Sequence, residues 1–379
     1  MASNPDGTRI SFFGTLGRNS GEIENCMEPL VNESSENSEN YSPFAAIIPF
    51  LFPALGGFLY GYDIGSTSCA TISIESPTLS GISWHNFNSV EIGLITSGSL
   101  YGALIGSVFA FTIADILGRR RELILAATVY FLGAIVTALT PNFVILIVGR
   151  FVYGVGIGLS MHAAPMYIAE TAPSQIRGRL ISLKEFFIVL GMVTGYGVGA
   201  LLVEAVSGWR YMYGVSTPLS LIMMTGMWWL PPSPRWLLLR FLQRGNEEEL
   251  LKEEAVKSLC RLRGESIGEN ASREVDLILS ELSATDKEDE TKIIELFQGK
   301  FLKAMIIGCG LVLLQQITGQ PSVLYYAPSI LQSAGFKAAS DATKVSILLG
   351  CLKLIMTGVA VLAIDKIGRR PLLLGGVSG

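Results

Sequence analysis

Two long uncharged runs of apolar residues, separated by a short basic turn, restrict this chain to very few folds. The runs cover residues 92–114 and 123–140. At about 1.5 Å per residue, a helix made of either run can cross the roughly 30 Å hydrocarbon core of a bilayer. The turn at 115–121 carries three arginines, and short basic loops stay on the cytoplasmic side of a membrane. The sequence therefore predicts two membrane-crossing helices joined by a cytosolic turn.

The motif in this turn occurs a second time. Residues 115–120 read Asp-Ile-Leu-Gly-Arg-Arg, and residues 365–370 read Asp-Lys-Ile-Gly-Arg-Arg, again directly after an apolar run. A single copy is weak evidence, because a basic loop beside a membrane helix can serve only to set topology. Two copies at the same position relative to a helix indicate a membrane protein built from internal repeats.

The composition agrees with this class and excludes others. Half of the residues are hydrophobic and only 16% are charged, whereas soluble domains carry about 25% charged residues. The mean hydropathy is +0.46. A net charge of −4 does not suggest a nucleic-acid partner. The five cysteines lie far apart and the chain has two histidines, so neither a disulfide framework, a metal site nor a cofactor is expected.

The apolar runs predict an all-α polytopic membrane protein with eight spans. They are placed near 44–65, 90–114, 122–140, 143–168, 181–203, 210–230, 303–333 and 344–364. With a cytosolic N-terminus, the loops that carry clustered arginines and the long hydrophilic segment all fall inside, as the distribution of basic residues requires.

These spans predict four regions. Residues 1–43 are polar and acidic without signal-peptide or transit-peptide features, so we expect a disordered cytosolic tail. Residues 44–230 form a bundle of six helices, and 231–302 form a cytosolic linker with amphipathic helices. Residues 303–379 supply about two helices of a second bundle and stop at the start of a ninth span. We therefore expect a chain truncated at its C-terminus.

Further motifs are each placed at a defined point relative to these spans. They are Gly61-Tyr62-Asp63, Gly149-Arg150, Pro165 to Glu170 with Arg177-Gly178-Arg179, Ser233-Pro234-Arg235, and Gln315-Gln316-Ile317-Thr318-Gly319 with Tyr325-Tyr326. Together with the repeated turn, they resemble the sugar porters of the major facilitator superfamily, especially the plant D-xylose-proton-symporter-like and vacuolar glucose transporters. The resemblance runs from about residue 44 to the end. It implies a major facilitator fold that moves a monosaccharide by alternating access, with protons as a second substrate.

Asp63 and Arg150 place charge within predicted spans. An unpaired charge there costs at least about 2.5–3.5 kcal/mol, so each must pair or face water. The resemblance implies that they are partners and that Asp63 is the proton-coupling site, because rearranging a carboxylate–guanidinium pair can take up and release a proton. The alternative is a structural ion pair at the end of a helix, close to the outer edge of the membrane.

Gln315 and Gln316 lie in an uncharged run at 304–336, where isolated amides are costly. Glutamine both donates and accepts hydrogen bonds, as a sugar requires. The resemblance implies that both contact sugar hydroxyls and that Tyr60, Tyr325 and Tyr326 form walls or gates. The alternative for the glutamines is hydrogen bonding between helices.

The chain departs from the pattern of the sugar porters at three positions. Pro321 stands where many of them have asparagine, so Gln320 is expected to compensate from a shifted backbone, or that contact is absent. Glu185 stands where the fifth span commonly offers glutamine. It could accept from sugar hydroxyls, titrate, or pair with Lys184 or another basic residue. Pro232 stands where an acidic residue is common after the sixth span.

The resemblance further implies that charges at cytosolic helix ends form salt bridges between the two bundles, which hold the outward-open state. This cytoplasmic gate comprises Asp115, Arg119, Arg120, Glu170, Arg177, Arg235, Asp365, Arg369 and Arg370. A role in topology alone is compatible with it. Gly154 to Gly158 are expected to allow close helix packing rather than phosphate binding. Lys353, midway along the eighth span, receives no role.

The expected function is proton-coupled transport of a hexose or pentose across a membrane, with the sugar, the proton and the lipid bilayer as partners. The 379-residue chain is expected to be inactive alone. No nucleophile, metal cluster or nucleotide loop suggests an enzyme. The alternative is a non-transporting sugar sensor, or a truncated modulator of full-length transporters. The resemblance favours the vacuolar membrane over the plasma membrane and the plastid envelope.

Overall fold

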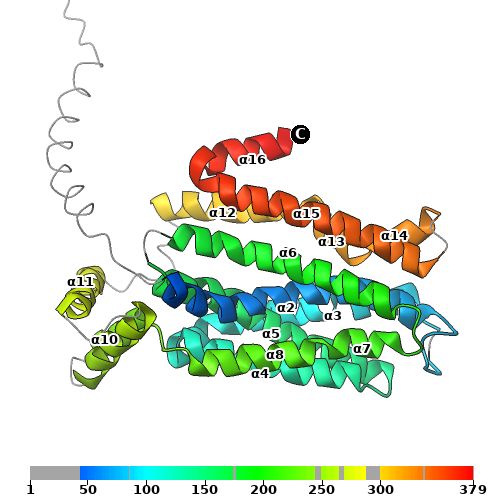
Figure 1. Cartoon of the computed structure of the whole chain (residues 1–379), viewed down its shortest axis with the longest axis horizontal. Coiled ribbons are helices and arrows are strands. Elements are labelled where there is room, and N and C mark those ends of the chain that lie inside the picture. Colours follow the sequence, from blue (N-terminus) through cyan, green and yellow to red (C-terminus); the bar gives the residue numbers. More distant parts are fainter. Residues whose placement is uncertain are drawn as a thin grey trace, which may run out of the picture. The chain divides into compact units, whose positions relative to one another are not determined.

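The computed structural model describes residues 43–84, 86–173, 176–243, 249–263, 269–286, 299–335 and 338–378, and the regular structure in these ranges is helical (Figure 1). The predicted acidic tail up to residue 42 lies outside the described residues. Residues 43–379 form one compact unit.

The first six predicted spans are helical at the expected places. They are α2 (Pro43–Glu75), α3 (Ser89–Leu117), α4 (Arg119–Ala138), α5 (Phe143–Thr171), α6 (Arg177–Leu202), and the pair α7 (Gly208–Gly214) with α8 (Ser216–Trp229). The prediction for the first span was too short, because α2 continues past residue 65 to Glu75. Asp63 therefore lies well inside a helix, and its expected position near the end of a span was wrong.

The remaining membrane segments are more broken than predicted. The predicted span 303–333 is three helices: α12 (Gly299–Ile317), α13 (Gln320–Tyr325) and α14 (Ala327–Ser333). Gly319 has φ 72°, a left-handed conformation that favours glycine and breaks the helix between α12 and α13. The chain continues with α15 (Ala339–Ile367) and α16 (Arg369–Ser378). Within the described residues, five helices are both long and apolar enough to cross a membrane: α3, α4, α5, α6 and α15.

Close approach of α3 and α5 depends on glycine. A Cβ atom on Gly154 would lie 2.0 Å from the backbone oxygen of Ser99, far inside contact distance. Gly102 and Gly158 stand equally close to the backbone of the facing helix. The prediction that the glycines from 154 to 158 serve helix packing is therefore confirmed, and Ser99 is held next to α5.

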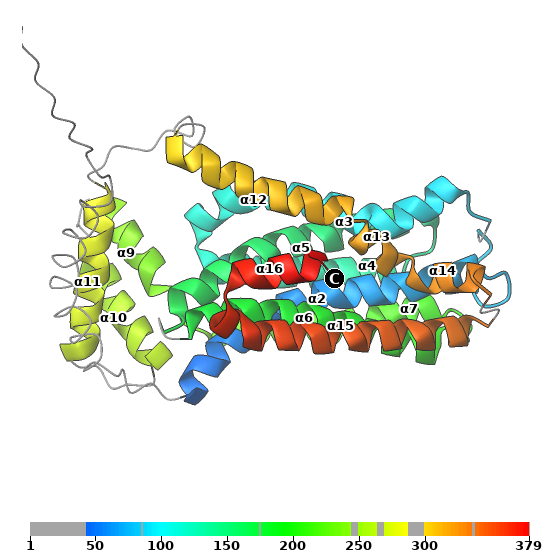
Figure 2. The ribbon, with the colours of Figure 1, turned by 90° about the horizontal axis from the view of Figure 1, so that it is seen from above.

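The helix α15 runs along α6 (Figures 1 and 2). A Cβ on Gly350 would lie 3.0 Å from Val193, and one on Gly358 would lie 3.5 Å from Phe186. This packing brings the segment after the linker against the first bundle, with the small residues of α15 facing α6.

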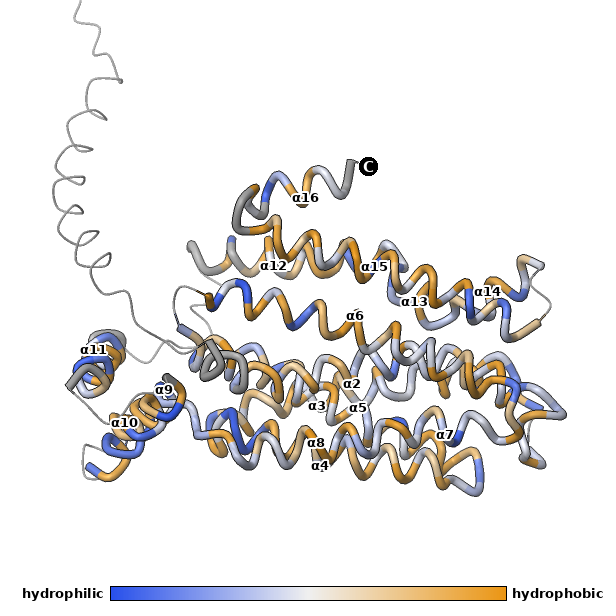
Figure 3. Tube along the Cα trace, viewed as in Figure 1, coloured by the Kyte–Doolittle hydropathy of each residue, from blue (hydrophilic) through white to orange (hydrophobic). Residues whose placement is uncertain are grey.

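The described part of the hydrophilic linker contains three amphipathic helices: α9 (Pro234–Gln243), α10 (Glu249–Arg263) and α11 (Glu269–Asp286). The hydropathy colouring shows polar and apolar positions mixed along α10 and α11, in contrast to the apolar α15 (Figure 3). Their buried sides share a small core in which Leu238, Ala255 and Val275 are fully covered. The expectation of amphipathic helices in this segment is confirmed.

Candidate functional site

A buried ion pair lies at the centre of the first bundle. Asp63 on α2 and Arg150 on α5 have side chains that are 2% and 1% exposed. Arg150 donates to both carboxylate oxygens of Asp63, Nη1 to Oδ1 and Nη2 to Oδ2, the latter at 3.2 Å. The Ser99 hydroxyl on α3 donates to Oδ2 at 2.9 Å and accepts from Nη2 of Arg150 at 3.0 Å. Three helices thus meet at one carboxylate.

The other sides of this pair are also occupied. The Nε of Arg150 donates to the carbonyl oxygen of Ile95 at 3.2 Å. The guanidinium carbon lies 5.1 Å from the centre of the Tyr213 ring, within the range of cation–π attraction. Thr67 donates more weakly to Oδ1 of Asp63, at 3.4 Å. The predicted partnership of Asp63 and Arg150 is therefore confirmed, and its place is the interior of the bundle instead of a helix end.

Two of the predicted tyrosines surround this pair. Tyr60 interacts electrostatically with both Asp63 and Glu185, and Tyr325 interacts with Asp63, Tyr60 and Arg150. The Tyr325 side chain is buried, and its hydroxyl lies near Ser99 without forming a hydrogen bond of normal geometry. A buried hydroxyl without a protein partner can bind a hydroxyl of a ligand.

A cavity of about 490 Å³ lies between α3 and the segment α12–α14, and Tyr325 is one of its lining residues. Gln316, Tyr325 and Tyr326 line one wall, and Ser97 and Tyr101 belong to the α3 wall. The cavity combines aromatic faces with amide and hydroxyl groups, which matches the mixed polar and apolar surface of a sugar. Gln315 and Gln320 are exposed and are not among its lining residues.

Glu185 lies on α6, the helix that packs against α15. Its side chain is 62% exposed and its Oε1 is 3.3 Å from Nζ of Lys184. Lys353 on α15 also interacts electrostatically with it. Glu185 thus pairs with Lys184, which is one of the alternatives for it. A role in accepting from sugar hydroxyls stays a prediction.

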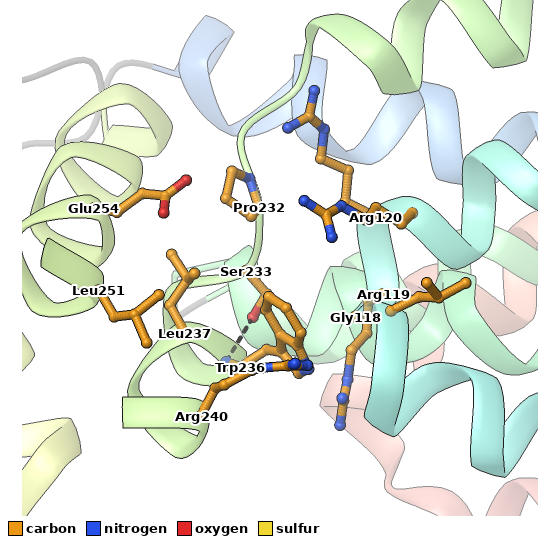
Figure 4. A pocket seen from close by; sticks show the side chains of 12 residues that line it. Gly118, Arg119, Arg120, Pro232, Ser233, Trp236, Leu237, Arg240, Leu251 and Glu254 are labelled. Atoms are coloured by element: carbon orange, nitrogen blue, oxygen red, sulfur yellow. Dashed lines mark hydrogen bonds between the residues drawn. The ribbon is translucent and has the colours of Figure 1, made fainter. Parts of the chain in front are cut away.

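At the other end of α3, Arg119 is the centre of a second charge cluster. Its Nε donates to Oε1 of Glu170 at 3.1 Å, and its Nη1 lies 4.0 Å from the exposed carboxylate of Asp115. Gly118 forms the turn before Arg119 with φ 81°. A Cβ atom added to Gly118 would lie 2.8 Å from the ring of Trp236 (Figure 4). A side chain here would be strained and would also displace α9.

The other predicted gate residues are not collected around Arg119. Arg120 donates to the carbonyl oxygens of Met227 and Trp228 at the end of α8 instead of to a carboxylate. Arg177, Arg235 and Arg370 are exposed. The side chains of Asp365 and Arg369 lie outside the described residues. The recorded pairs among the gate residues join α3, α4 and α5, so the predicted bridging between bundles remains a prediction.

The sequence analysis missed a buried pair on α4 and α5. Glu122 is fully buried, and its Oε1 lies 3.0 Å from Nδ1 of His162. One signal was available, because Glu122 begins an apolar run and His162 is one of two histidines in the chain. Ser99 and Tyr213 were missed as well. Serine and tyrosine are ordinary in membrane helices, and only the packing shows which of them reach Arg150.

The fold and these two charge clusters define a class of protein. Residues 50–379 match the family model described as "Sugar (and other) transporter". The chain belongs to this family of the major facilitator superfamily and is an integral, multi-pass membrane protein.

The similar proteins are sugar transporters and not enzymes. The chain is 68% identical over 381 residues to D-xylose-proton symporter-like 2 of Arabidopsis thaliana, covering 100% of this chain and 76% of that protein. It is 56% identical over 371 residues to the chloroplastic D-xylose-proton symporter-like 3 of the same plant, covering 97% and 66%. Among solved structures, the proton:xylose symporter XylE bound to 6-bromo-6-deoxy-D-glucose has a TM-score of 0.73 at 27% identity, covering 88% of this chain and 72% of XylE.

Proposed function

We propose that residues 1–379 form the sugar-binding and proton-coupling part of a monosaccharide–proton symporter. The observation that carries this proposal is the buried pair of Asp63 and Arg150 with Ser99 bridging both. A carboxylate held in the interior by a guanidinium that has other acceptors available can exchange that partner for a proton. The Ile95 carbonyl and the Tyr213 ring are such alternatives for Arg150.

The sugar binds beside this pair. Gln316, Tyr325 and Tyr326 line the cavity. Tyr60 and Tyr325 lie close enough to Asp63 to sense its charge. Gln315, Gln320 and Glu185 approach the sugar in other conformations, since all three are exposed. Because Tyr325 lines the cavity and lies within electrostatic reach of Asp63 and Arg150, a bound sugar can change the environment of Asp63. This is the coupling that symport needs.

The predicted regions complete the proposal. Residues 44–230 form one rocking bundle, 231–302 form a cytosolic connection, and 303–379 contribute to the second bundle. The turn at 115–121 and the gate residues face the cytosol, and residues 1–43 lie on the same side. The relatives named as xylose symporters support a pentose or hexose as substrate. The vacuolar membrane is the proposed location on the resemblance to vacuolar glucose transporters alone.

The test uses a chain that continues beyond residue 379 with the corresponding segment of D-xylose-proton symporter-like 2. Purified protein is reconstituted into liposomes, and uptake of labelled xylose and glucose is followed with and without an inward proton gradient. We expect accumulation above the external concentration only with the gradient, and its loss when a protonophore is added. Sugar binding without accumulation or exchange would instead support a sensor.

A further inference from the structure

A second cavity, of about 420 Å³, lies where α4, α8 and α10 meet. It is lined by three basic side chains, Arg120, Lys257 and Arg261, against a single acidic side chain among the described lining residues, Glu254. Arg120 is repelled by Arg121 and Arg261 and attracted by Glu254. Lys257 pairs with Glu253 at 3.6 Å. The three basic groups of the cavity thus outnumber the two acidic groups beside them, and the remaining positive charge favours a bound anion.

The helix α10 presents this charge on one face. Glu254, Lys257 and Arg261 recur at a spacing of three and four residues, so they lie along one side of the helix. The opposite side is packed into the core shared with α9 and α11, where Ala255 and Leu259 are buried. Arg120 and Glu254 stand on opposite sides of Pro232 (Figure 4). The cavity thus lies between helices that are packed against their neighbours.

The remaining wall of the cavity is the end of a membrane helix. Trp228 and Trp229 line it and are 69% and 61% exposed. Arg261 lies over the Trp229 ring, with its guanidinium carbon 5.6 Å from the ring centre. Tryptophans at the end of a span mark the level of lipid headgroups. The exposed Leu221 and Ile222 continue the same side of α8 toward the bilayer core.

We propose that this basic cavity binds the phosphate-bearing headgroup of an anionic membrane phospholipid, whose acyl chains lie along the exposed side of α8. Lys257 and Arg261 contact the phosphate, and Arg120, already anchored on the end of α8, contributes charge behind them. A soluble phosphate ester has the same headgroup chemistry, but only a lipid also covers the tryptophans and the apolar stripe. In the orientation proposed above, the cavity faces the leaflet that carries anionic lipids.

The experiment measures lipid binding by the purified 379-residue chain in detergent micelles, so it depends on neither transport nor orientation. Fluorescent phosphatidylinositol 4-phosphate is titrated, with phosphatidylcholine as the neutral comparison and free inositol 4-phosphate as the headgroup alone. We expect the double variant Lys257→Gln/Arg261→Gln to bind the anionic lipid at least about tenfold more weakly. We expect Lys257→Arg/Arg261→Lys to retain binding.

The matched control is Lys252→Gln/Arg273→Gln, which also removes two positive charges, one from α10 and one from α11. Lys252 pairs with Asp276 at 2.7 Å, and neither Lys252 nor Arg273 lines the cavity. We expect the control to bind the anionic lipid as the parent chain does. Equal loss in both double variants, equal binding of phosphatidylcholine, or displacement by free inositol 4-phosphate at the concentration of the lipid would each overturn the proposal.

Discussion

Asp63 is held by Arg150, Ser99 and Thr67 from three different helices, α5, α3 and α2 itself. Removing one partner of a buried ion pair commonly destabilises a protein by about 3–5 kcal/mol, since the other charge is left uncompensated. Arg150 differs from that general case because a carbonyl and an aromatic ring also face it. The pair can therefore separate during a transport cycle without leaving the guanidinium bare.

The first prediction concerns this carboxylate. Asp63→Asn in the extended chain should abolish sugar accumulation driven by a pH gradient, because the amide keeps the shape of the site and cannot titrate. Sugar exchange at equal concentrations should persist, and it shows at the same time that the variant is folded. Concentrative uptake that survives in Asp63→Asn would place the coupling proton elsewhere, with Glu185 as the next candidate.

The second prediction concerns the amide in the sugar cavity. Gln316→Ala removes a hydrogen bond worth about 0.5–1.5 kcal/mol, so the KM for sugar uptake should rise roughly two- to tenfold. Gln315→Ala should act in the same direction if the helix turns it toward the sugar. Gln332→Ala on α14, outside the lining of the cavity, is the control. Unchanged kinetics in Gln315→Ala and Gln316→Ala would exclude both as sugar contacts.

The third prediction concerns the buried pair of Glu122 and His162. In His162→Leu the Glu122 carboxyl loses its partner, which should cost about 1–3 kcal/mol of stability. The double variant Glu122→Leu/His162→Leu should lose less than the sum of the two single variants, with a coupling energy of about 0.5–3 kcal/mol. Unfolding of the first bundle in denaturant measures each value, and additive losses would show that the pair is not coupled.

At the scale of elements, the packing of α3 on α5 decides whether the site exists. Ser99 reaches Asp63 and Arg150 only because Gly154 lets the backbones of the two helices approach. Alanine at such a position forces the helices apart, although it is the better helix former by roughly 0.5–1 kcal/mol. Helix propensity and helix packing therefore predict opposite effects of the same substitution.

The variant Gly154→Ala distinguishes the effect of helix propensity from that of helix packing. We expect it to lower the thermal stability of the purified chain by about 1–3 kcal/mol, the usual cost of overpacking. Gly197→Ala on α6 is the matched control, since nothing lies within 4 Å of its added methyl group. That control should be neutral or slightly stabilising. If both substitutions stabilise the chain equally, the close approach of α3 and α5 is not maintained in solution.

At the scale of the whole molecule, the ion pair and the cavity lie among different sets of the described helices. The pair of Asp63 and Arg150 is held by α2, α3 and α5, whereas the cavity proposed to bind the sugar lies between α3 and α12–α14. Large apolar side chains of α3 and α15 are exposed, among them Leu104, Phe111, Leu352 and Leu362. Alternating access rocks one complete bundle against another around such a cavity.

The last prediction follows from this division. Residues 1–379 in liposomes should show no saturable uptake of labelled xylose or glucose, because residues 303–379 supply only part of a second rocking bundle. The extended chain in the same liposomes is the positive control. Denaturation of residues 1–379 should still show a cooperative transition for the first bundle. Saturable, inhibitor-sensitive flux from residues 1–379 alone would contradict the prediction.

The sequence by itself determined the class of protein and the approximate places of its apolar helices. Uncharged runs and arginine-rich turns can be recognised in the sequence alone, because a helix that crosses the bilayer needs a minimum apolar length and charge in the hydrocarbon core is costly. The same cost required only that Asp63 and Arg150 each pair or face water, and the resemblance to the sugar porters predicted that they are partners. The repeated Asp-x-x-Gly-Arg-Arg turn marked the charge cluster where Arg119 meets Glu170.

Only the tertiary structure decided which ordinary residues take part. Ser99 and Tyr213 carry no distinctive sequence signal, and their roles depend on where α3, α5 and α7 cross. The pairing of His162 with Glu122 depends on the packing of α5 on α4. Helix–helix distances, set by glycines in contact, are a property of pairs of segments that no single segment specifies.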